Sequence, residues 1–311
     1  MLEIKCKQNW QCKNTIMIKR TIYIGNPSYL KIKQKQLVVQ EPETKEVKGT
    51  VPIEDIALLM LDHYQITISN QLLIKLQGNN VAVISCDEHH LPFGMMLPMV
   101  GHSEYSERIK YQITASEPLK KQLWKQTVEQ KIKNQKALLD LNNKVSEPLA
   151  EYKLTVKSGD TTNREGMAAQ FYWKHLFENF SRERYGQEPN NLLNFGYAVL
   201  RSIVARALVS SGMLPVLGIF HRNKYNPYCL ADDIMEPYRP FVDKLVYNYV
   251  VINNNYELNK EAKAHILTIA TQDVYIDGLA RPLFVAVTTT TASLYKCFTG
   301  ELRQIKYPEL D

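Results

Sequence analysis

The sequence has few cysteines, and they form no recognisable pairing pattern. Its 311 residues include five Cys, at positions 6, 12, 86, 229 and 297, and none belongs to a Cys-x-x-Cys pair. An odd number without such a pair argues against a disulfide framework and against a zinc ribbon. Reduced thiols are the simplest account, and they indicate a cytoplasmic protein.

Segments that would direct the chain to a membrane are also missing. The first 20 residues contain five Lys or Arg and lack the apolar core of a secretory signal. No window approaches 18 apolar residues without charge, which predicts that no helix spans a membrane. Residues 1–16 are polar and rich in Asn, Gln and Lys, and Met17 could be a second start, so we interpret 1–16 as a candidate N-terminal extension.

Several common catalytic motifs are absent as well. The chain has no GxxxxGK[ST] phosphate loop, no GxGxxG dinucleotide fingerprint, no GxSxG nucleophile elbow and no HExxH zinc motif. These absences argue against the nucleotide hydrolases, dinucleotide enzymes, α/β-hydrolases and zinc proteases that carry those motifs. The remaining candidates for chemistry are acids and histidines.

Charge is unevenly distributed along the chain. There are 38 Lys and Arg against 32 Asp and Glu, a formal net of +6. Residues 105–157 contain 11 Lys or Arg and 6 Asp or Glu, so this stretch alone contributes +5. A local basic stretch suggests a polyanionic partner on one face of the protein. A solvated Lys-rich helix explains the same charges, and charge alone favours that second interpretation.

The chain changes character near residue 100, which predicts an α+β protein of two domains. Short β-branched runs separated by turn residues predict a β-sandwich-like domain over 17–100. Within it we expect two helices, at 53–61 and 70–77. The Pro- and Gly-containing segment 90–101 predicts an interdomain linker, near 90–104. Residues 105–311 are expected to form an all-α domain.

The helical half begins with a basic amphipathic pattern. One apolar stripe consists of Leu119, Leu123, Trp124, Val128, Ile132 and Leu139. Around it lie Lys120, Lys121, Lys125, Lys131, Lys133 and Lys136. Residues 191–211 are apolar on nearly every face and are interrupted by Arg201 and Arg206, so we expect a buried core helix too short to span a membrane.

Three places in the helical half hold residues capable of metal chemistry. Glu165 lies in Asn-Arg-Glu-Gly, where a surface helix residue is the simpler interpretation. His221 follows an apolar run, and a lone His there is usually structural. Asp233 and Glu236 are three residues apart, so a helix places both on one face. Acids in a first helical turn are the alternative, although Pro237 and Pro240 interrupt a regular helix.

Together these residues suit a divalent cation bound beside phosphates. Carboxylates with one imidazole fit Mg²⁺ or Mn²⁺ better than a structural zinc. Arg164, Arg222, Lys224 and Arg239 lie beside the acids and could hold phosphates. The rival cluster at 86–90 (Cys-Asp-Glu-His-His) is interpreted as a turn at a strand end, because adjacent residues on a strand point to opposite faces. His175 and His265 are interpreted as packing residues.

The order of these features resembles a known family. A β-rich half, a linker and a Lys-rich helix are followed by Asn163-Arg-Glu-Gly166, His221 and Asp233-x-x-Glu-Pro-Tyr-Arg-Pro240. This order, with 15 residues from His221 to Glu236, resembles the CRISPR-associated integrase family, CRISPR-associated protein one. Ile53–Ile56, Cys86–Pro92 and Lys133–Gln135 resemble the branch encoded beside RNA-guided effector nucleases (type II).

The resemblance implies both an activity and its residues. It implies a metal-dependent DNA endonuclease and integrase of CRISPR adaptation, in which the 3′-hydroxyl of a foreign DNA fragment attacks a phosphodiester at the end of a repeat. By motif, Glu165, His221 and Glu236 would be the catalytic metal ligands for Mg²⁺ or Mn²⁺. Asp233 would be a supporting or alternative ligand, and Asp232 a weaker choice. The DNA-contacting candidates are Arg164, Lys224, Arg239, Lys120, Lys121 and Lys125.

The resemblance also implies partners. It implies a homodimer joined through the β-domains, and a complex with CRISPR-associated protein two, on foreign DNA and the CRISPR leader-repeat. Two alternatives remain open on the residues alone. One is a metal-dependent nuclease that cuts branched or single-stranded DNA without joining it. The other is a non-catalytic DNA-binding scaffold.

Overall fold

The protein was analysed as a computed structural model that describes residues 2–3, 19–183 and 186–311. The chain divides into two compact units, Met1–Met99 and Val100–Asp311. The boundary falls inside the segment 90–104 that the sequence analysis assigned to a linker. Of the candidate extension 1–16, only Leu2–Glu3 lies within the described residues, as the short strand β1.

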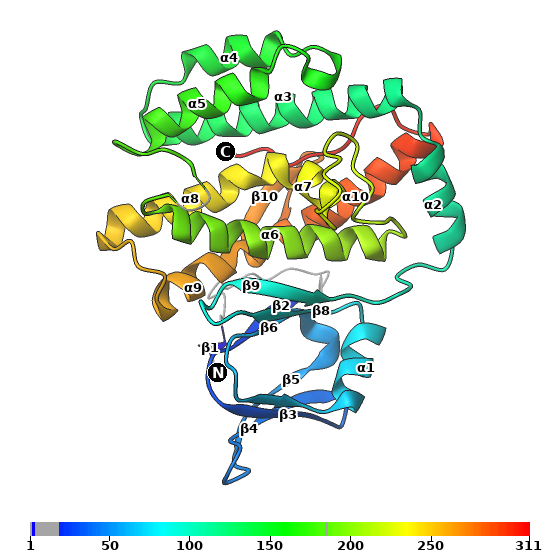
Figure 1. Cartoon of the computed structure of the whole chain (residues 1–311), viewed down its shortest axis with the longest axis vertical. Coiled ribbons are helices and arrows are strands. Elements are labelled where there is room, and N and C mark those ends of the chain that lie inside the picture. Colours follow the sequence, from blue (N-terminus) through cyan, green and yellow to red (C-terminus); the bar gives the residue numbers. More distant parts are fainter. Residues whose placement is uncertain (1, 4–18, 184–185) are drawn as a thin grey trace. The chain divides into compact units, whose positions relative to one another are not determined.

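The first unit contains two β-sheets and one helix (Figure 1). One sheet has the order β1-β2-β6-β8-β9, in which β2, β6 and β8 run parallel. The other has the order β5-β4-β3-β7. The strands are β2 (Arg20–Ile24), β3 (Ser28–Lys33), β4 (Gln36–Gln40), β5 (Val47–Pro52), β6 (Ile56–Leu61), β7 (Ile66–Ile68), β8 (Ala82–Cys86) and β9 (Pro92–Met96).

The two sheets and helix α1 (Asn70–Gly78) bury one shared core. Ile22 and Leu59 come from one sheet, Leu30 and Leu37 from the other, and Leu72 from the helix. Burial of apolar side chains between two sheets is the main stabilising contribution of a sandwich. The sheets followed by a helical region confirm the α+β prediction, and α1 confirms the helix predicted at 70–77.

Two predicted elements of this unit are wrong. Residues 53–61 form a 3₁₀ turn, η1 (Ile53–Asp55), and then the strand β6 instead of a helix. β6 lies between β2 and β8 in the middle of the sheet, so both its faces are buried and its sequence has no alternation. The linker prediction also fails for Pro92–Met96, which is the strand β9 paired with β8.

The second unit is built mainly from helices (Figure 1). Its longest, α3 (Glu117–Leu141), carries the predicted apolar stripe, and the side chain of Ser116 caps it by accepting from the Leu119 amide. The other elements are α2 (Tyr105–Thr114), α4 (Glu147–Leu154), η2 (Ser158–Asp160), α5 (Arg164–Leu176), α6 (Asn190–Ser210), α7 (Cys229–Met235), η3 (Glu236–Tyr238), α8 (Arg239–Asn253), α9 (Lys260–Leu267), η4 (Thr268–Thr271) and α10 (Leu283–Thr299).

Helix α6 is the core of this unit. Nearly all its side chains are buried, as predicted. The prediction that it is too short to cross a membrane is wrong, since its 21 residues suffice by length and its mean hydropathy reaches 1.4 over 18 residues. However, 83% of that window is buried inside the protein, which is typical of a core helix.

One β-hairpin interrupts the helices. β10 (Asp273–Ile276) pairs with β11 (Leu279–Pro282) around Asp277 and Gly278, both with positive φ. Asp-Gly is among the strongest short signals for a two-residue hairpin turn, so this hairpin could have been predicted from the sequence. The expected all-α domain therefore contains this hairpin in addition.

The segment α7–η3–α8 changes helix type where prolines occur. Pro237 lies in η3, and Pro240 lies in the first turn of α8. Each proline lacks an amide donor, so a continuous α-helical bond pattern is not available there. The short 3₁₀ turn places Glu236 at the junction of two α-helices.

Candidate active site

Glu165 lies in the first turn of α5, and an acid four residues before the start of the helix fixes that turn. The Asp160 carboxylate accepts from the Arg164 amide at 2.8 Å and from the Glu165 amide at 2.9 Å. These bonds satisfy amides that a helix start leaves without partners. The backbone that carries Glu165 is therefore held in one position, with its side chain directed toward α3.

Lys131, on α3, joins Glu165 to Glu236. Its Nζ lies 2.7 Å from Glu165 Oε1 and 2.6 Å from Glu236 Oε2. The ammonium is buried, and burial works against its charge. Attraction to Glu236 and Glu165 outweighs that effect, so the pKa of Lys131 is raised. The ammonium thus stays charged between the two carboxylates.

Glu236 has a second cationic partner. Its Oε1 lies 2.9 Å from a terminal guanidinium nitrogen of Arg239. The carboxyl is buried, which would raise its pKa, but Arg239 and then Lys131 hold that pKa below its ordinary value. The Arg239 guanidinium also covers the ring of Tyr197 at 4.6 Å. Glu236 is therefore an ionised acid with both oxygens engaged.

His221 is oriented by Asp233. The Nδ1 atom of His221 lies 2.5 Å from Asp233 Oδ1, and Asp233 Oδ2 accepts from the amides of Ile219 and Phe220 at 2.7 and 2.9 Å. The hydrogen bond to Asp233 raises the pKa of His221, and burial raises the pKa of Asp233. Both directions mean that a proton is held firmly between the pair. Because Asp233 occupies Nδ1, the Nε2 atom of His221 is the ring nitrogen that points away from Asp233.

Close packing around His221 restricts the ring further. Trp124, fully buried on α3, stacks on Phe220 with ring centroids 4.2 Å apart and meets the edge of His221 at 5.5 Å. At Gly218, a Cβ would lie 2.4 Å from the His221 carbonyl oxygen and 2.8 Å from Asp233 Oδ2. Only glycine leaves room for this loop to fold against Asp233.

The structure thus brings Glu165, His221 and Glu236 from α5, a loop and η3 into one neighbourhood. Both glutamates raise the pKa of His221 through their charge, after the larger effects of Asp233 and burial. Within the described part of the chain, no three His, Cys, Asp or Glu side chains converge closely enough to hold a metal ion as they stand. Between the two glutamates lies the ammonium of Lys131.

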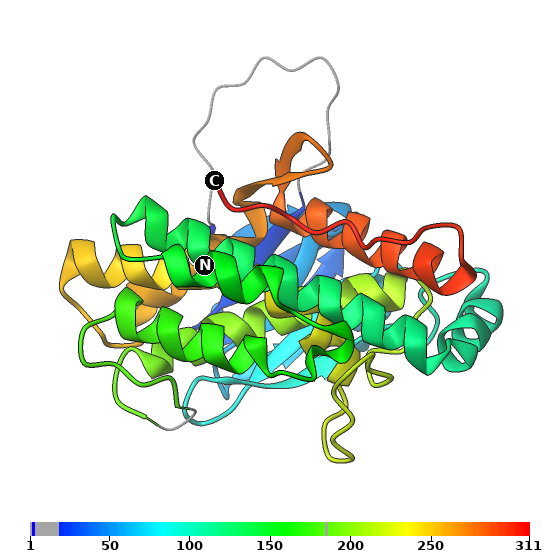
Figure 2. The ribbon, with the colours of Figure 1, turned by 90° about the horizontal axis from the view of Figure 1, so that it is seen from above.

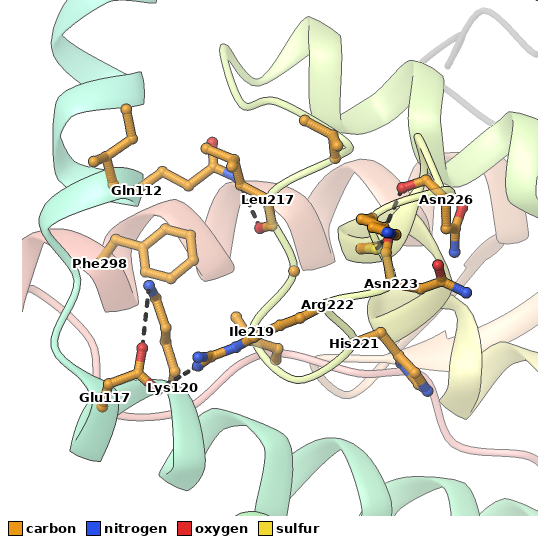
Figure 3. Close-up of a pocket in the computed structure, with 15 residues that line it drawn as sticks. Gln112, Glu117, Lys120, Leu217, Ile219, His221, Arg222, Asn223, Asn226 and Phe298 are labelled. Carbon is orange, nitrogen blue, oxygen red and sulfur yellow. Dashed lines mark hydrogen bonds and ion pairs between the residues drawn. The ribbon is translucent and has the colours of Figure 1, made fainter.

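A cavity of about 390 Å³ adjoins His221 (Figure 3). Lys120, Arg222 and Lys224 line it with Glu117 and the ring of Phe298. Figure 3 shows Lys120 and Arg222 both reaching toward Glu117, with His221 directed away from them. The cavity wall therefore has more positive than negative side chains.

The six residues predicted to contact DNA occupy different surroundings. Lys120 lies 3.8 Å from Glu117, and Lys125 lies 3.6 Å from Glu129. Lys121 is exposed on α3, and Lys224 is exposed in the loop after His221. The Arg164 guanidinium lies 5.8 Å from the centre of the Tyr152 ring. Arg239, in contrast, is bound to Glu236, and its role toward DNA stays a prediction.

The other candidates behave as the structural interpretations predict. Residues 86–90 are the last residue of β8 and most of the turn to β9, where Asp87 Oδ1 accepts from the amides of His89 and Leu91. His175 bonds to the Phe171 carbonyl, and His265 bonds to that of Leu245. Asp232 pairs with Arg201 at 2.6 Å instead of joining Glu236.

Lys131 is the site residue that the sequence did not reveal. It lies among five other lysines around one apolar stripe, and helical periodicity alone placed it with the solvated charges. A weak signal existed, because Lys131 is three residues after Val128 and seven after Trp124, a spacing that places it on the apolar side of the helix. Its partners come from residues 34 and 105 positions away, which no local pattern shows.

Comparison with known sequences identifies the family. The profile of the family described as "CRISPR associated protein Cas1" matches residues 22–277. The CRISPR-associated endonuclease Cas1 of Neisseria meningitidis serogroup C (strain 8013) is 36% identical over 296 residues, which cover 94% of this chain and 96% of that protein.

Solved structures share the fold. A casposase bound to its integration product matches with a TM-score of 0.77 at 19% identity, covering 93% of this chain and 92% of that one. A chain of a Cas6-RT-Cas1–Cas2 complex matches with a TM-score of 0.73 at 17% identity, covering 98% of this chain and 37% of that one. The predicted family is confirmed: this chain belongs to the CRISPR-associated protein Cas1 family.

Proposed function

We propose that this chain is a metal-dependent DNA endonuclease and integrase of CRISPR adaptation. The observation that carries the proposal is that Lys131 joins Glu165 to Glu236 and that both glutamates act through their charge on the pKa of His221, whose Nδ1 atom is held by Asp233. The Neisseria relative is named an endonuclease and the casposase is titled with an integration product, which agrees with cutting and joining DNA.

The donor set fits Mg²⁺ or Mn²⁺. Two carboxylates supply the hard oxygens that these ions prefer, and a His fixed by a carboxylate through its other nitrogen is the usual arrangement of a metal-bound His. Glu165, His221 and Glu236 would hold the ion, and Asp233 would orient His221. When bound, such an ion stabilises the charge that develops on the attacking and leaving oxygens of a phosphodiester.

The reaction exchanges one phosphodiester for another. The 3′-hydroxyl of the incoming fragment bonds to phosphorus at the end of the repeat and loses its proton. The bond to the 3′ oxygen of the cut strand breaks, and that oxygen leaves as a hydroxyl. One ester bond forms and one breaks, so no nucleotide cofactor is required. The cationic cavity beside His221 suits the phosphates of a DNA end.

The partners follow from the same assignment. A cytoplasmic homodimer joined through the β-rich unit, acting with a Cas2 protein, would bind the fragment and the leader-repeat together. The Cas1–Cas2 content of the matched complex supports the second partner. Arg164, Lys224, Arg239, Lys120, Lys121 and Lys125 are the residues proposed to contact DNA.

The test is a joining assay with labelled fragments on a supercoiled plasmid that carries a leader-repeat, in Mg²⁺ or Mn²⁺. We expect Glu165→Ala, His221→Ala and Glu236→Ala each to lower the yield of joined product by at least about 100-fold, more than loss of a supporting residue does. DNA binding, measured by gel shift in EDTA, should persist. The exposed Glu257→Gln is the matched control and should join normally.

The products separate the three candidate functions. Nicked plasmid without attached label would support a nuclease that cuts without joining. Full activity in all three alanine variants would contradict the metal site and favour a DNA-binding scaffold. Joined product that disappears only in the site variants would support the integrase.

A further inference from the structure

Lys131 occupies the point that a metal ion would need. The two oxygens that face one another, Glu165 Oε1 and Glu236 Oε2, are both within 2.7 Å of its Nζ. An Mg²⁺ ion bonded to both carboxylates would lie about 2.0–2.1 Å from each oxygen. An ammonium and a divalent cation cannot share that space, because their like charges repel at such short range.

The charges of the site lead to the same conclusion. Glu165 and Glu236 are paired with the two cations Lys131 and Arg239, whereas Asp233 is paired with His221. Without Lys131 the two glutamates would lie close together with only Arg239 to offset their repulsion, and burial would strengthen that repulsion.

We infer that Lys131 is a built-in counter-cation, which holds Glu165 and Glu236 together in the metal-free protein and is displaced when a divalent ion binds. This inference rests on the metal site proposed above. Metal binding is then an exchange of one cation for another at a preformed pair of carboxylates. Lys131 keeps the acids oriented, at the expense of metal affinity.

Other lysines on α3 do not meet these conditions. Lys125 pairs with Glu129 one turn away, and Lys133 pairs with Glu309. Both are far more exposed than Lys131, whose side chain is 11% exposed. Their substitution removes the same charge from the same helix without touching Glu165 or Glu236. Lys133 is not among the residues proposed to contact DNA, so Lys133→Met is the matched control.

The experiment compares Lys131→Met with the wild type at one pH, using the full chain freed of metal by EDTA and dialysis. Mn²⁺ binding is measured by calorimetry, and thermal unfolding is measured in EDTA and in saturating Mn²⁺. We expect the affinity for Mn²⁺ to rise at least about fivefold, the low end of coupling between two ligands of one protein. The melting temperature should fall in EDTA and recover in Mn²⁺.

Each alternative result has a distinct meaning. A melting temperature lowered equally in EDTA and Mn²⁺, with unchanged Mn²⁺ affinity, would show that Lys131 is only structural and would overturn the inference. If Glu165→Gln bound Mn²⁺ as the wild type does, or if the wild type bound no Mn²⁺, the proposed metal site would instead be refuted.

A second variant covers the case in which Lys131→Met does not fold. Lys131→Arg keeps the charge, and its planar guanidinium can bond to both carboxylates. We expect Mn²⁺ affinity equal to or weaker than that of the wild type. A stronger affinity in Lys131→Arg would contradict the exchange of cations. Lys133→Met should match the wild type in both measurements.

Discussion

Asp243, on α8, is a buried acid that the proposed chemistry does not use. Its two oxygens accept from the hydroxyls of Tyr172 and Tyr197 at 2.9 and 2.5 Å. Burial raises its pKa to about 6, although both tyrosines and the charges of Arg182 and Arg239 oppose that shift. Tyr197 in turn lies under the Arg239 guanidinium, so Asp243 supports the wall behind Glu236.

This shift predicts a dependence of stability on pH. The pKa of Asp243 rises from its ordinary value of 3.8 to about 6 in the folded protein. The folded protein therefore binds this proton more tightly than the unfolded chain does. The contribution of this residue to the free energy of unfolding therefore falls as pH rises through that window, by about 3 kcal/mol in all. Asp243→Asn should remove this fall, so the variant gains stability over the wild type toward neutral pH.

Urea unfolding in EDTA from pH 4 to 7 measures the difference. Of the three tryptophans, Trp124 and Trp173 lie in the second unit, so in a Trp10→Phe background the fluorescence follows that unit. The free energy of the wild type minus that of Asp243→Asn should decrease steadily with pH. A constant difference would be incompatible with a raised pKa at Asp243. Asp273→Asn, exposed at the start of β10, is the control.

At the scale of elements, the C-terminal segment and the turn that carries Glu236 are hydrogen-bonded to the same residue of α3. The last residues run beside α3 (Figures 1 and 2). Asn134, fully buried on α3, donates to the carbonyls of Pro237 and Pro308 and accepts from the Leu310 amide. One side chain thus connects the turn that carries Glu236 with the end of the chain.

Asn134→Ala should therefore loosen both segments. It leaves two carbonyls and one amide without this partner, and each buried group costs about 1–3 kcal/mol. We expect the free energy of unfolding to fall by about 3 kcal/mol or more. Hydrogen exchange should become faster over 305–311 and 236–239. Asn142→Ala is the control, because its side chain donates only to the nearby Leu138 carbonyl. Unchanged exchange in Asn134→Ala would contradict the role of Asn134 in holding the C-terminal segment and the turn of Glu236 in place.

Some helices and strands were predictable from the sequence, and others were not. The stripe on α3 and the core helix α6 were predictable because helical burial leaves a period in the sequence. β6 was not, since a central strand buried on both faces has no period to distinguish it from a helix. The candidate site residues came from motif order, and the geometry places them in one neighbourhood. Lys131 was missed because its partners are set by tertiary packing alone.

At the scale of the whole molecule, the basic stretch has a divided role. Of its lysines, Lys131 is inside the site, and Lys133 and Lys136 form close ion pairs at 2.6 and 2.7 Å, whereas Lys120 and Lys125 lie 3.8 and 3.6 Å from their acids. Lys120, Lys121 and Lys125 remain on the first half of α3, and Lys120 also lines the cavity beside His221. This placement favours a DNA-binding surface over a uniformly solvated helix.

Removing these three charges should change how DNA binding responds to salt. Each Lys that contacts a phosphate contributes about one unit to the slope of log affinity against log salt. Lys120→Ala, Lys121→Ala and Lys125→Ala combined should therefore weaken binding and flatten the slope by up to about 3. Fluorescence anisotropy with a labelled duplex, from 50 to 300 mM KCl in EDTA, gives both quantities. EDTA removes divalent ions, so the assay measures binding to this surface without any metal-assisted binding at Glu165 and Glu236.

A control of equal charge decides whether the position of the lysines matters. Lys33, Lys48 and Lys75 are exposed in the first unit, and changing them to Ala removes the same three charges. If only the net charge of the molecule attracted DNA, both triple variants would lose affinity and slope alike. If α3 forms the binding surface, only its variant changes the slope. A slope unchanged by the α3 variant would remove this helix from the DNA-binding surface, because counterion release depends on the phosphates actually contacted.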